Sequence, residues 1–274
     1  MYRRRSSSSG GGLSKGRILV ALAIAAFSVL SYCASKQYNP YTDEEQYVAI
    51  NKEQEIALGL QAAPEMEQQF GGEDPDQQAQ ALLDEVCTNL IQANALNETE
   101  YPFECTLLAD DETINAFALP GGQVFITAAL FDQLESVDQL AGVMGHEIGH
   151  AVARHSAQQM AKAQLTQGLT GAAVIAAYDP DNPSTQQTAA VAALIGQVIN
   201  MKFGRDDEIQ SDILGVRYMD EAGYDPCQML TVMEILAQAG GANRPPEFFS
   251  THPNPENRME NIREAIAETG NSCP

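Results

Sequence analysis

The pentapeptide His146-Glu147-Ile148-Gly149-His150 has the residue types and spacing of a metal-dependent hydrolase. Residues four apart in an α-helix lie on one face, so His146 and His150 can bind one ion together. Glu147 follows the first histidine and can act as general base toward a water molecule beside that ion. Because imidazole ligands suit Zn²⁺, we predict one zinc ion per chain as the cofactor.

The sequence around this pentapeptide has the periodicity of a helix. Apolar residues recur at helical spacing, at Leu140, Val143, Met144, Ile148 and Val152. A chance occurrence of the pattern on an ordinary helix is the alternative interpretation, and the helical context argues against it.

A third metal ligand must come from elsewhere in the chain, because a catalytic zinc site needs three protein ligands and one position open to water. Candidate carboxylates are Asp207, Glu208 and Asp212. Glu208 and Asp212 are four residues apart, so one can bind the ion while the other orients a ligand histidine. Spacing alone does not choose among the three carboxylates. A solvated acidic helix start is the alternative, since acidic residues favour the first turn.

The chain has four histidines, and the two outside the pentapeptide are His155 and His252. On a continuous helix His155 lies about 140° around from His150, which prevents it from sharing the same ion easily. We therefore expect His155 to be structural. His252 lies in the short motif Thr251-His252-Pro253 and remains a candidate site residue.

Further patterns predict the elements that must position these side chains. We expect helices over residues 51–70, 76–94, 136–164, 206–221, 226–239 and 255–269, and strands over residues 103–108 and 123–127. Residues 168–200 are rich in Ala, Gly and Thr and favour two helices separated by a Pro-broken loop. Residues 165–200 are a candidate for a mobile lid over the site.

The N-terminal segment has the features of an export signal, with basic residues before an apolar run from Ile18 to Leu30. This run is shorter than the roughly 20 residues that cross a bilayer. An uncleaved anchor helix is the alternative. The sequence Leu30-Ser31-Tyr32-Cys33 is similar to the lipobox of bacterial lipoproteins, although Tyr32 replaces the small residue usual before the acylated cysteine. We predict a signal peptide over residues 1–33 and a tether over residues 34–50.

Four cysteines remain after Cys33 and suggest two disulfide bonds in an exported chain. Three pairings are possible. We prefer Cys87–Cys105, which joins a predicted helix to the next strand, and Cys227–Cys273, which ties the C-terminal tail to the domain. Buried free thiols are the alternative. None of the spacings is Cys-x-x-Cys, which argues against metal ligation by cysteine.

The chain is strongly acidic, with 37 acidic and 15 basic residues and a formal net charge of −22. Such a surface repels nucleic acid and anionic membranes, so we expect neither as a partner. Solubility explains the charge more simply than an acidic binding function does.

Taken together in order, the motifs resemble the gluzincin-type zinc endopeptidases that include LoiP, BepA, HtpX and the CaaX prenyl endopeptidase. The similar segments are Asn115–Gly122, His146–His150, Glu208–Asp212 with Ser211 in place of the usual Ala, and Thr251–Pro253 followed by Arg258. The resemblance covers nearly all of the chain after Cys33. It is strongest to the short exported lipoproteins of the LoiP type.

The resemblance implies a role for each site residue. His146, His150 and Glu208 are the zinc ligands, and Glu147 is the catalytic base. Asp212 supports a ligand histidine. His252 either stabilises the oxyanion or occupies the metal in a resting, self-inhibited state.

The resemblance also implies an α+β fold, mostly helical, with a small sheet next to the active helix. The zinc metallopeptidase domain is then residues 51–274, attached to the outer membrane from the periplasm through lipidated Cys33. Its substrates would be unfolded or misassembled envelope proteins, paired as an added strand along Gln123–Thr127. Alternatives are an assembly chaperone for outer-membrane proteins with weak protease activity, or a metal hydrolase of small molecules with an enclosed pocket. The sequence leaves the oligomeric state open.

Overall fold

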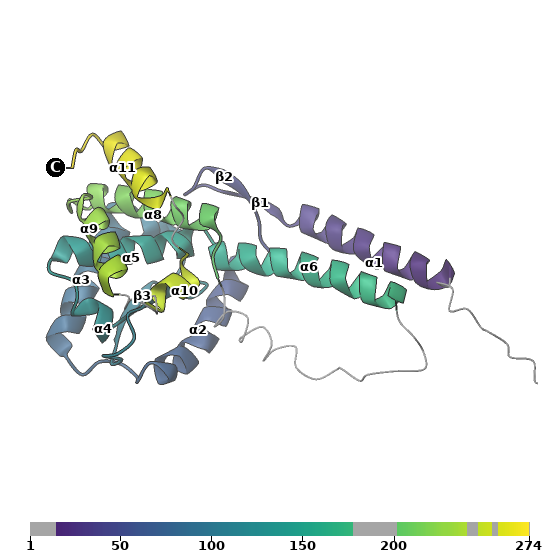
Figure 1. The fold of residues 1–274 in the computed structure, drawn as a ribbon, viewed down its shortest axis with the longest axis horizontal. Coiled ribbons are helices and arrows are strands. Elements are labelled where there is room, and N and C mark those ends of the chain that lie inside the picture. The colour runs from purple at the N-terminus through teal and green to yellow at the C-terminus, as the bar shows by residue number, and fades with distance from the viewer. Residues whose placement is uncertain (1–14, 178–201, 240–245, 254–256, 274) are drawn as a thin grey trace, which may run out of the picture.

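Helix α5, Val137–Val152, is almost wholly buried and packs against neighbouring helices and the sheet. The computed structural model describes residues 15–177, 202–239, 246–253 and 257–273. Figure 1 shows a helical body around α5 and a pair of helices that projects from it.

Most of the described chain is helical. Before α5 lie α1 (Lys15–Ala34), α2 (Lys52–Gln69), α3 (Gln77–Ala93), the 3₁₀ helix η1 (Leu96–Thr99) and α4 (Ala128–Phe131). After α5 lie α6 (His155–Ala177), α8 (Arg205–Glu221), α9 (Gln228–Ala239), α10 (Phe248–Thr251) and α11 (Arg258–Glu268). The predicted helices over residues 51–70, 76–94, 206–221 and 226–239 therefore form with shifts of one or two residues at their ends, whereas α10 was not predicted.

A small mixed sheet lies beside α5. Strand β5 (Gln123–Thr127) lies in its centre, parallel to β3 (Glu104–Leu108) and antiparallel to β4 (Ala116–Ala118). The expectation that Gln123–Thr127 is a free edge is therefore wrong, because both of its edges are paired and all of its residues are buried. The outer strands of the sheet are β3, whose outer edge is bonded by Gln80 and Asp74, and β4, whose three residues are all buried. This combination of many helices with a small sheet confirms the predicted α+β class.

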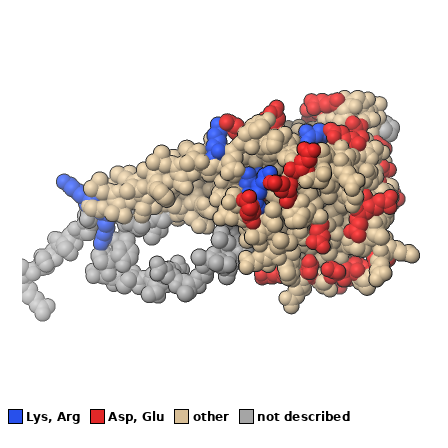
Figure 2. All heavy atoms as spheres, turned by 180° about the vertical axis from the view of Figure 1, so that it is seen from behind, with Lys and Arg blue, Asp and Glu red and all other residues tan. Residues whose placement is uncertain are grey.

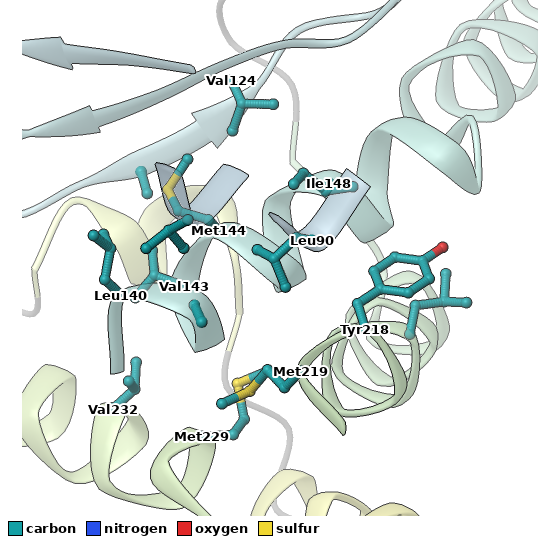
Figure 3. Packing of buried hydrophobic residues seen from close by; sticks show 14 of the residues in the cluster. Leu90, Val124, Leu140, Val143, Met144, Ile148, Tyr218, Met219, Met229 and Val232 are labelled. Atoms are coloured by element: carbon teal, nitrogen blue, oxygen red, sulfur yellow. The ribbon is translucent and has the colours of Figure 1, made fainter. Parts of the chain in front are cut away.

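The main hydrophobic core forms where α3, α5, α8 and α9 meet under the sheet. Figure 3 shows Val143 and Met144 of α5 close to residues of the neighbouring helices. Every residue of α5 from Gln139 to Val152 is buried. The helix that carries the pentapeptide is thus fixed on all sides by packing.

The predicted single helix over residues 136–164 is in fact two helices. Arg154 has a left-handed backbone (φ 58°) and breaks the chain direction between α5 and α6. Its side chain donates to the carboxylate of Glu55, to Oε1 of Gln37 and to the carbonyl of Ile50. These contacts from distant segments stabilise a conformation that a non-glycine residue adopts only rarely. The break changes the direction of every side chain after it.

The segment expected to be a tether, residues 34–50, contains a hairpin that packs on the body. Strands β1 (Lys36–Asn39) and β2 (Glu44–Tyr47) pair with each other. The side chains of Asn39 and Gln46 donate to the carbonyls of Val152 and Ala153 at the end of α5. The hairpin therefore satisfies carbonyl groups that a helix C-terminus leaves unpaired.

Helix α1 is longer than the apolar run at its centre. With 20 residues it is, within the described part of the chain, the helix whose length and composition would allow it to cross a membrane. The expectation that this segment is too short to span is corrected, because Lys15–Arg17 and Ser31–Ala34 extend the helix at both ends. A signal sequence near an N-terminus has the same properties.

The two projecting helices differ from the body in charge. Helix α6 runs beside α1, and a Cβ atom at Gly168 would lie 2.1 Å from Oγ of Ser28. Figure 2 shows acidic side chains spread over the body, whereas the projection carries none on that face. Residues 165–177, the first part of the expected lid, form the second half of α6, and the expected loop and second helix lie outside the described residues.

Both preferred cysteine pairings are present, Cys87–Cys105 and Cys227–Cys273. The first joins α3 to β3, and the second joins the start of α9 to the segment after α11. Cys33 is an exposed free thiol at the end of α1.

Candidate metal centre

Helices α5 and α8 approach each other closely because glycines face each other along their contact. A Cβ atom at Gly215 would lie 3.0 Å from the backbone nitrogen of His146 and 3.2 Å from the carbonyl carbon of Gly145. A Cβ atom at Gly149 would lie 3.1 Å from the carbonyl oxygen of Ser211. This close approach brings the pentapeptide on α5 to the acidic first turns of α8.

Four buried side chains meet between these helices and α10. Ligand atoms of His146, His150, Glu208 and His252 all lie within 4.8 Å of one another. The Nε2 atoms of His146 and His150 are 3.1 Å apart, and Oε1 of Glu208 is 3.4 Å from Nε2 of His150. Ligands of one tetrahedral zinc ion are separated by about 3.3 Å, given bond lengths near 2.0 to 2.1 Å. The donor set and its spacing therefore fit a zinc ion.

Glu147 lies beside this cluster without binding to it. Both of its carboxylate oxygens are buried and have no hydrogen-bond partner in the described structure, and Oε1 is 3.6 Å from Nε2 of His252. Burial raises the pKa of Glu147, although His252 and His146 act in the opposite direction. A buried, unpaired carboxylate is costly unless it serves a ligand or a water molecule. Its position suits a group that takes a proton during the reaction.

Glu208 is the carboxylate that reaches the two histidines of the pentapeptide. Burial alone would raise its pKa, but His252 and His150 outweigh that effect and hold the pKa of Glu208 well below its usual range. Arg258 also forms an ion pair with its Oε2 at 3.0 Å. Asp207 points elsewhere, since it accepts hydrogen bonds from Gln159 and from the backbone of Gly204. The structure thus brings Glu208 to the histidines and directs Asp207 away from them, a choice that sequence spacing left open.

Asp212 and Arg258 form the layer behind the ligands. Oδ1 of Asp212 lies 2.8 Å from Nδ1 of His146, and the carboxylate accepts two hydrogen bonds from Arg258 at 2.7 and 2.9 Å. Burial would raise the pKa of Asp212, but the Arg258 guanidinium and His146 lower it. An ionised carboxylate at Nδ1 leaves Nε2 of His146 free to bind an ion.

His252 enters the cluster from the end of α10. Its Nδ1 lies 3.1 Å from Oε1 of Glu208, and its ring stacks on Phe248 at a centroid distance of 4.4 Å. Burial alone would lower the pKa of His252, but Glu147 and Glu208 outweigh it and raise the pKa. The distant Thr251–Pro253 motif is therefore adjacent to the pentapeptide in space.

Two contributors to the site were not recognised as such in the sequence. Phe203 stacks on His150 at a centroid distance of 4.0 Å and, with Phe248, forms an apolar wall around the histidines. No spacing rule connects a lone phenylalanine to a site on another helix. The sequence placed Arg258 only in the motif that begins at Thr251–Pro253. Its positive charge, which can pair with the carboxylates of the other motifs, was the feature that could have identified it as part of the site.

His155 lies next to the site, contrary to the expectation from a continuous helix. Its Nδ1 is 2.9 Å from Nδ1 of His150, because the turn at Arg154 directs it back toward α5. Burial lowers the pKa of His155. His155 therefore contacts the candidate ligand His150 at its Nδ1, the ring nitrogen of His150 that does not face the cluster.

A helix that carries two histidines and a base, with a carboxylate from a second helix and a small sheet alongside, defines a metallopeptidase of the zincin type. The model of peptidase family M48 matches residues 77–266, so the chain belongs to this family. The family predicted from the motifs is thereby confirmed.

The chain is similar to proteins named as bacterial and mitochondrial proteases. It is 37% identical over 173 residues to the beta-barrel assembly-enhancing protease of Escherichia coli (strain K12), covering 61% of this chain and 35% of that protein. It is 33% identical over 159 residues to the mitochondrial metalloendopeptidase OMA1 of Arabidopsis thaliana, covering 58% and 31%. OMA1 of Schizosaccharomyces pombe is 26% identical over 249 residues, covering 90% and 71%. The matched part spans about a third of the length of the first two relatives.

Proposed function

We propose that this chain is a zinc-dependent endopeptidase that cleaves unfolded or misassembled proteins of the bacterial envelope. The observation that carries the proposal is the meeting of His146, His150 and Glu208 beside a buried, unpaired Glu147. Membership of a peptidase family whose relatives are named as proteases supports the same reaction.

Each residue has a role that follows from its position. His146, His150 and Glu208 would hold the zinc ion, which supplies a Lewis acid that activates water and polarises a peptide carbonyl. Glu147 takes the proton from the attacking water and delivers it to the leaving amine. The burial of Glu147 suits both halves of this transfer, because a desolvated carboxylate accepts a proton more readily than one in water.

Two alternative roles are open to His252, and the variant His252→Ala distinguishes between them. Its ring is within reach of both Glu147 and Glu208, where it can stabilise the oxyanion or remain on the metal position in a resting state. If His252 stabilises the oxyanion, His252→Ala lowers kcat. If it blocks the site, His252→Ala raises the basal rate, measured on the same unfolded substrate.

Because both edges of β5 are paired, we assign the substrate-binding edge to β4 in place of β5. In the antiparallel ladder the backbone groups of Phe117 point toward β5, so those of Ala116 and Ala118 point the other way. Among the described residues no loop or side-chain group bonds these outward groups, although Ala116 and Ala118 are themselves buried. A peptide added along β4 would run next to α5. It would be bound mainly through backbone hydrogen bonds, so the site would select weakly among substrate sequences.

The decisive experiment compares casein cleavage by the wild type and by Glu147→Gln. Loss of the general base is expected to lower the rate by about 10²- to 10⁴-fold while zinc remains bound. Asp132→Asn, a change at the end of α4 away from the site, is the control and should cleave normally. Equal cleavage by wild type and Glu147→Gln, or none by either with zinc bound, would refute the protease.

A second candidate function is an assembly chaperone with a weak or self-inhibited protease. It is favoured by the name of the Escherichia coli relative and by His252 within the ligand cluster. Suppression of aggregation by Glu147→Gln at the wild-type level, with no cleavage by the wild type, would select this function. Hydrolysis of small molecules is the remaining alternative and predicts activity on short esters or amides without protein cleavage.

We also propose that the chain is exported and anchored from the periplasm to the outer membrane. Helix α1, the exposed Cys33 at its end and the two disulfide bonds support export. The proposed division is a signal peptide over residues 1–33 and a zinc metallopeptidase domain over residues 51–274. Radiolabelled palmitate should be incorporated by the wild type and not by Cys33→Ala, and the fractionation of the two should differ.

A further inference from the structure

A line of four polar side chains runs outward from His150 to the molecular surface. Nδ1 of His150 lies 2.9 Å from Nδ1 of His155, and Nε2 of His155 lies 2.9 Å from Oε1 of Gln210. Nε2 of Gln210 donates to Oε2 of Glu44 at 2.8 Å. The line connects α5, α6 and α8 with the N-terminal hairpin, since Glu44 is the first residue of β2.

Hydrogen-bond chemistry determines the direction of every bond along this line. The ionised Glu44 carboxylate only accepts, so the amide group of Gln210 faces it and the carbonyl oxygen of Gln210 faces His155. That oxygen accepts, so Nε2 of His155 carries the proton. Neutral imidazole has one donor and one acceptor, which makes Nδ1 of His155 the acceptor.

The last bond then assigns the tautomer of His150. Nδ1 of His150 donates to Nδ1 of His155, and its Nε2 lone pair is left to face His146 and Glu208. His155 is 1% exposed, and the hydrogen bonds at its two ring nitrogens are those of a neutral imidazole, with one donor and one acceptor. The hydroxyl of Ser211 lies 3.3 Å from the same Nδ1 and can donate to it without changing the direction of the line.

We propose that His155 is a positioning residue for the metal, which fixes the tautomer and ring orientation of His150 through the line His155–Gln210–Glu44. This inference rests on the proposed zinc site. His155 does for His150 what Asp212 does for His146, so each histidine of the pentapeptide has its own partner at Nδ1. Glu44 also places the N-terminal hairpin in the same bonded line.

Zinc affinity tests the proposal without relying on catalysis. Metal-free protein is titrated with zinc against a chromophoric chelator, for the wild type, His155→Phe, Gln210→Leu and Gln158→Ala. Phenylalanine keeps a buried ring but removes the acceptor, so the zinc Kd should rise about ten- to hundredfold. Gln210→Leu should raise the Kd by less. Gln158→Ala is the matched control, since Gln158 lies on the same turn of α6 and its side chain donates to the carbonyl of Ala153.

A cobalt-substituted protein gives a second readout that a purely structural residue would not change. The visible absorption bands of Co²⁺ should shift in His155→Phe and remain unchanged in Gln158→Ala. A folded His155→Phe with wild-type zinc affinity and spectrum would overturn the proposal. If His155→Phe does not fold, wild-type affinity in Gln210→Leu overturns it instead. Failure of the wild type to bind zinc would refute the proposed function itself, which distinguishes the two.

Discussion

Nδ1 of His146 and Oδ1 of Asp212 lie 2.8 Å apart in a fully buried layer behind the ligand cluster. Arg258 donates two hydrogen bonds to the same carboxylate, so one aspartate pairs with both a histidine and a guanidinium. The position of a histidine on α5 is thereby tied to α8 and α11.

Asp212→Asn should weaken this layer in two measurable ways. The amide is neutral, so zinc affinity should fall about ten- to hundredfold because His146 loses its charged partner. The variant also removes the negative charge that pairs with buried Arg258, and a broken buried ion pair costs about 3 to 5 kcal/mol of stability. Chelator competition and urea unfolding measure the two effects. Asp206→Asn, an exposed change on the same helix, should alter neither; similar losses in both variants would contradict the explanation.

The sequence predicts the parts of the site that depend on local spacing. His146, Glu147 and His150 are placed by the helix alone, since their relation is one turn of regular backbone. Glu208 could be chosen over Asp207 only through the resemblance to a family, because both lie in one helical turn. The elements around them were predicted within a few residues wherever periodicity and turn signals agreed.

What the sequence did not predict depends on contacts between distant residues. The turn at Arg154 is stabilised by Glu55 and Gln37, which are 99 and 117 residues away. No local propensity favours a left-handed arginine. The position of His155 follows from that turn, and the pairing of β5 on both edges follows from the sheet as a whole.

The close contact of α5 and α8 predicts opposite effects for two glycine substitutions. At Gly215 a Cβ atom would press on backbone atoms of Gly145 and His146, so Gly215→Ala should destabilise the protein by about 1 to 3 kcal/mol. At Gly142, on α5, the nearest atoms are 3.6 Å away, so Gly142→Ala should be neutral or stabilising by up to about 1 kcal/mol. Urea unfolding with bound zinc measures both. Equal effects would show that the contact has room to relax.

The two disulfide bonds should differ in their contribution to stability. Cys227–Cys273 closes a longer loop, with a sequence separation of 46 against 18 for Cys87–Cys105. The loss of loop-closure entropy in the unfolded chain predicts costs of about 4 and about 3 kcal/mol when each pair is replaced by serine. Thermal unfolding of the two double variants under oxidising conditions tests the order. A reversed order would indicate that native contacts, and not the loops, dominate.

The buried carboxyl of Glu55 predicts a pH dependence that is independent of the metal ligands. Glu55 accepts hydrogen bonds from Tyr101 and Arg154, and Arg154 forms the turn between α5 and α6. Burial raises the pKa of Glu55, and the charge of Arg154 offsets this only in part. A pKa that is higher in the folded state means that folding favours the protonated form.

The sign of the effect follows from that linkage. The contribution of Glu55 to stability is fully present below its unfolded pKa of about 4.3 and is lost as the pH rises through the folded value. The free energy of unfolding of the wild type should therefore fall relative to Glu55→Gln as the pH rises from about 4.3 toward neutrality. Urea unfolding of zinc-saturated protein at several pH values measures the difference, in which contributions of the metal site cancel. Glu53→Gln, exposed on the same helix, should follow the wild type, and parallel curves for wild type and Glu55→Gln would contradict the prediction.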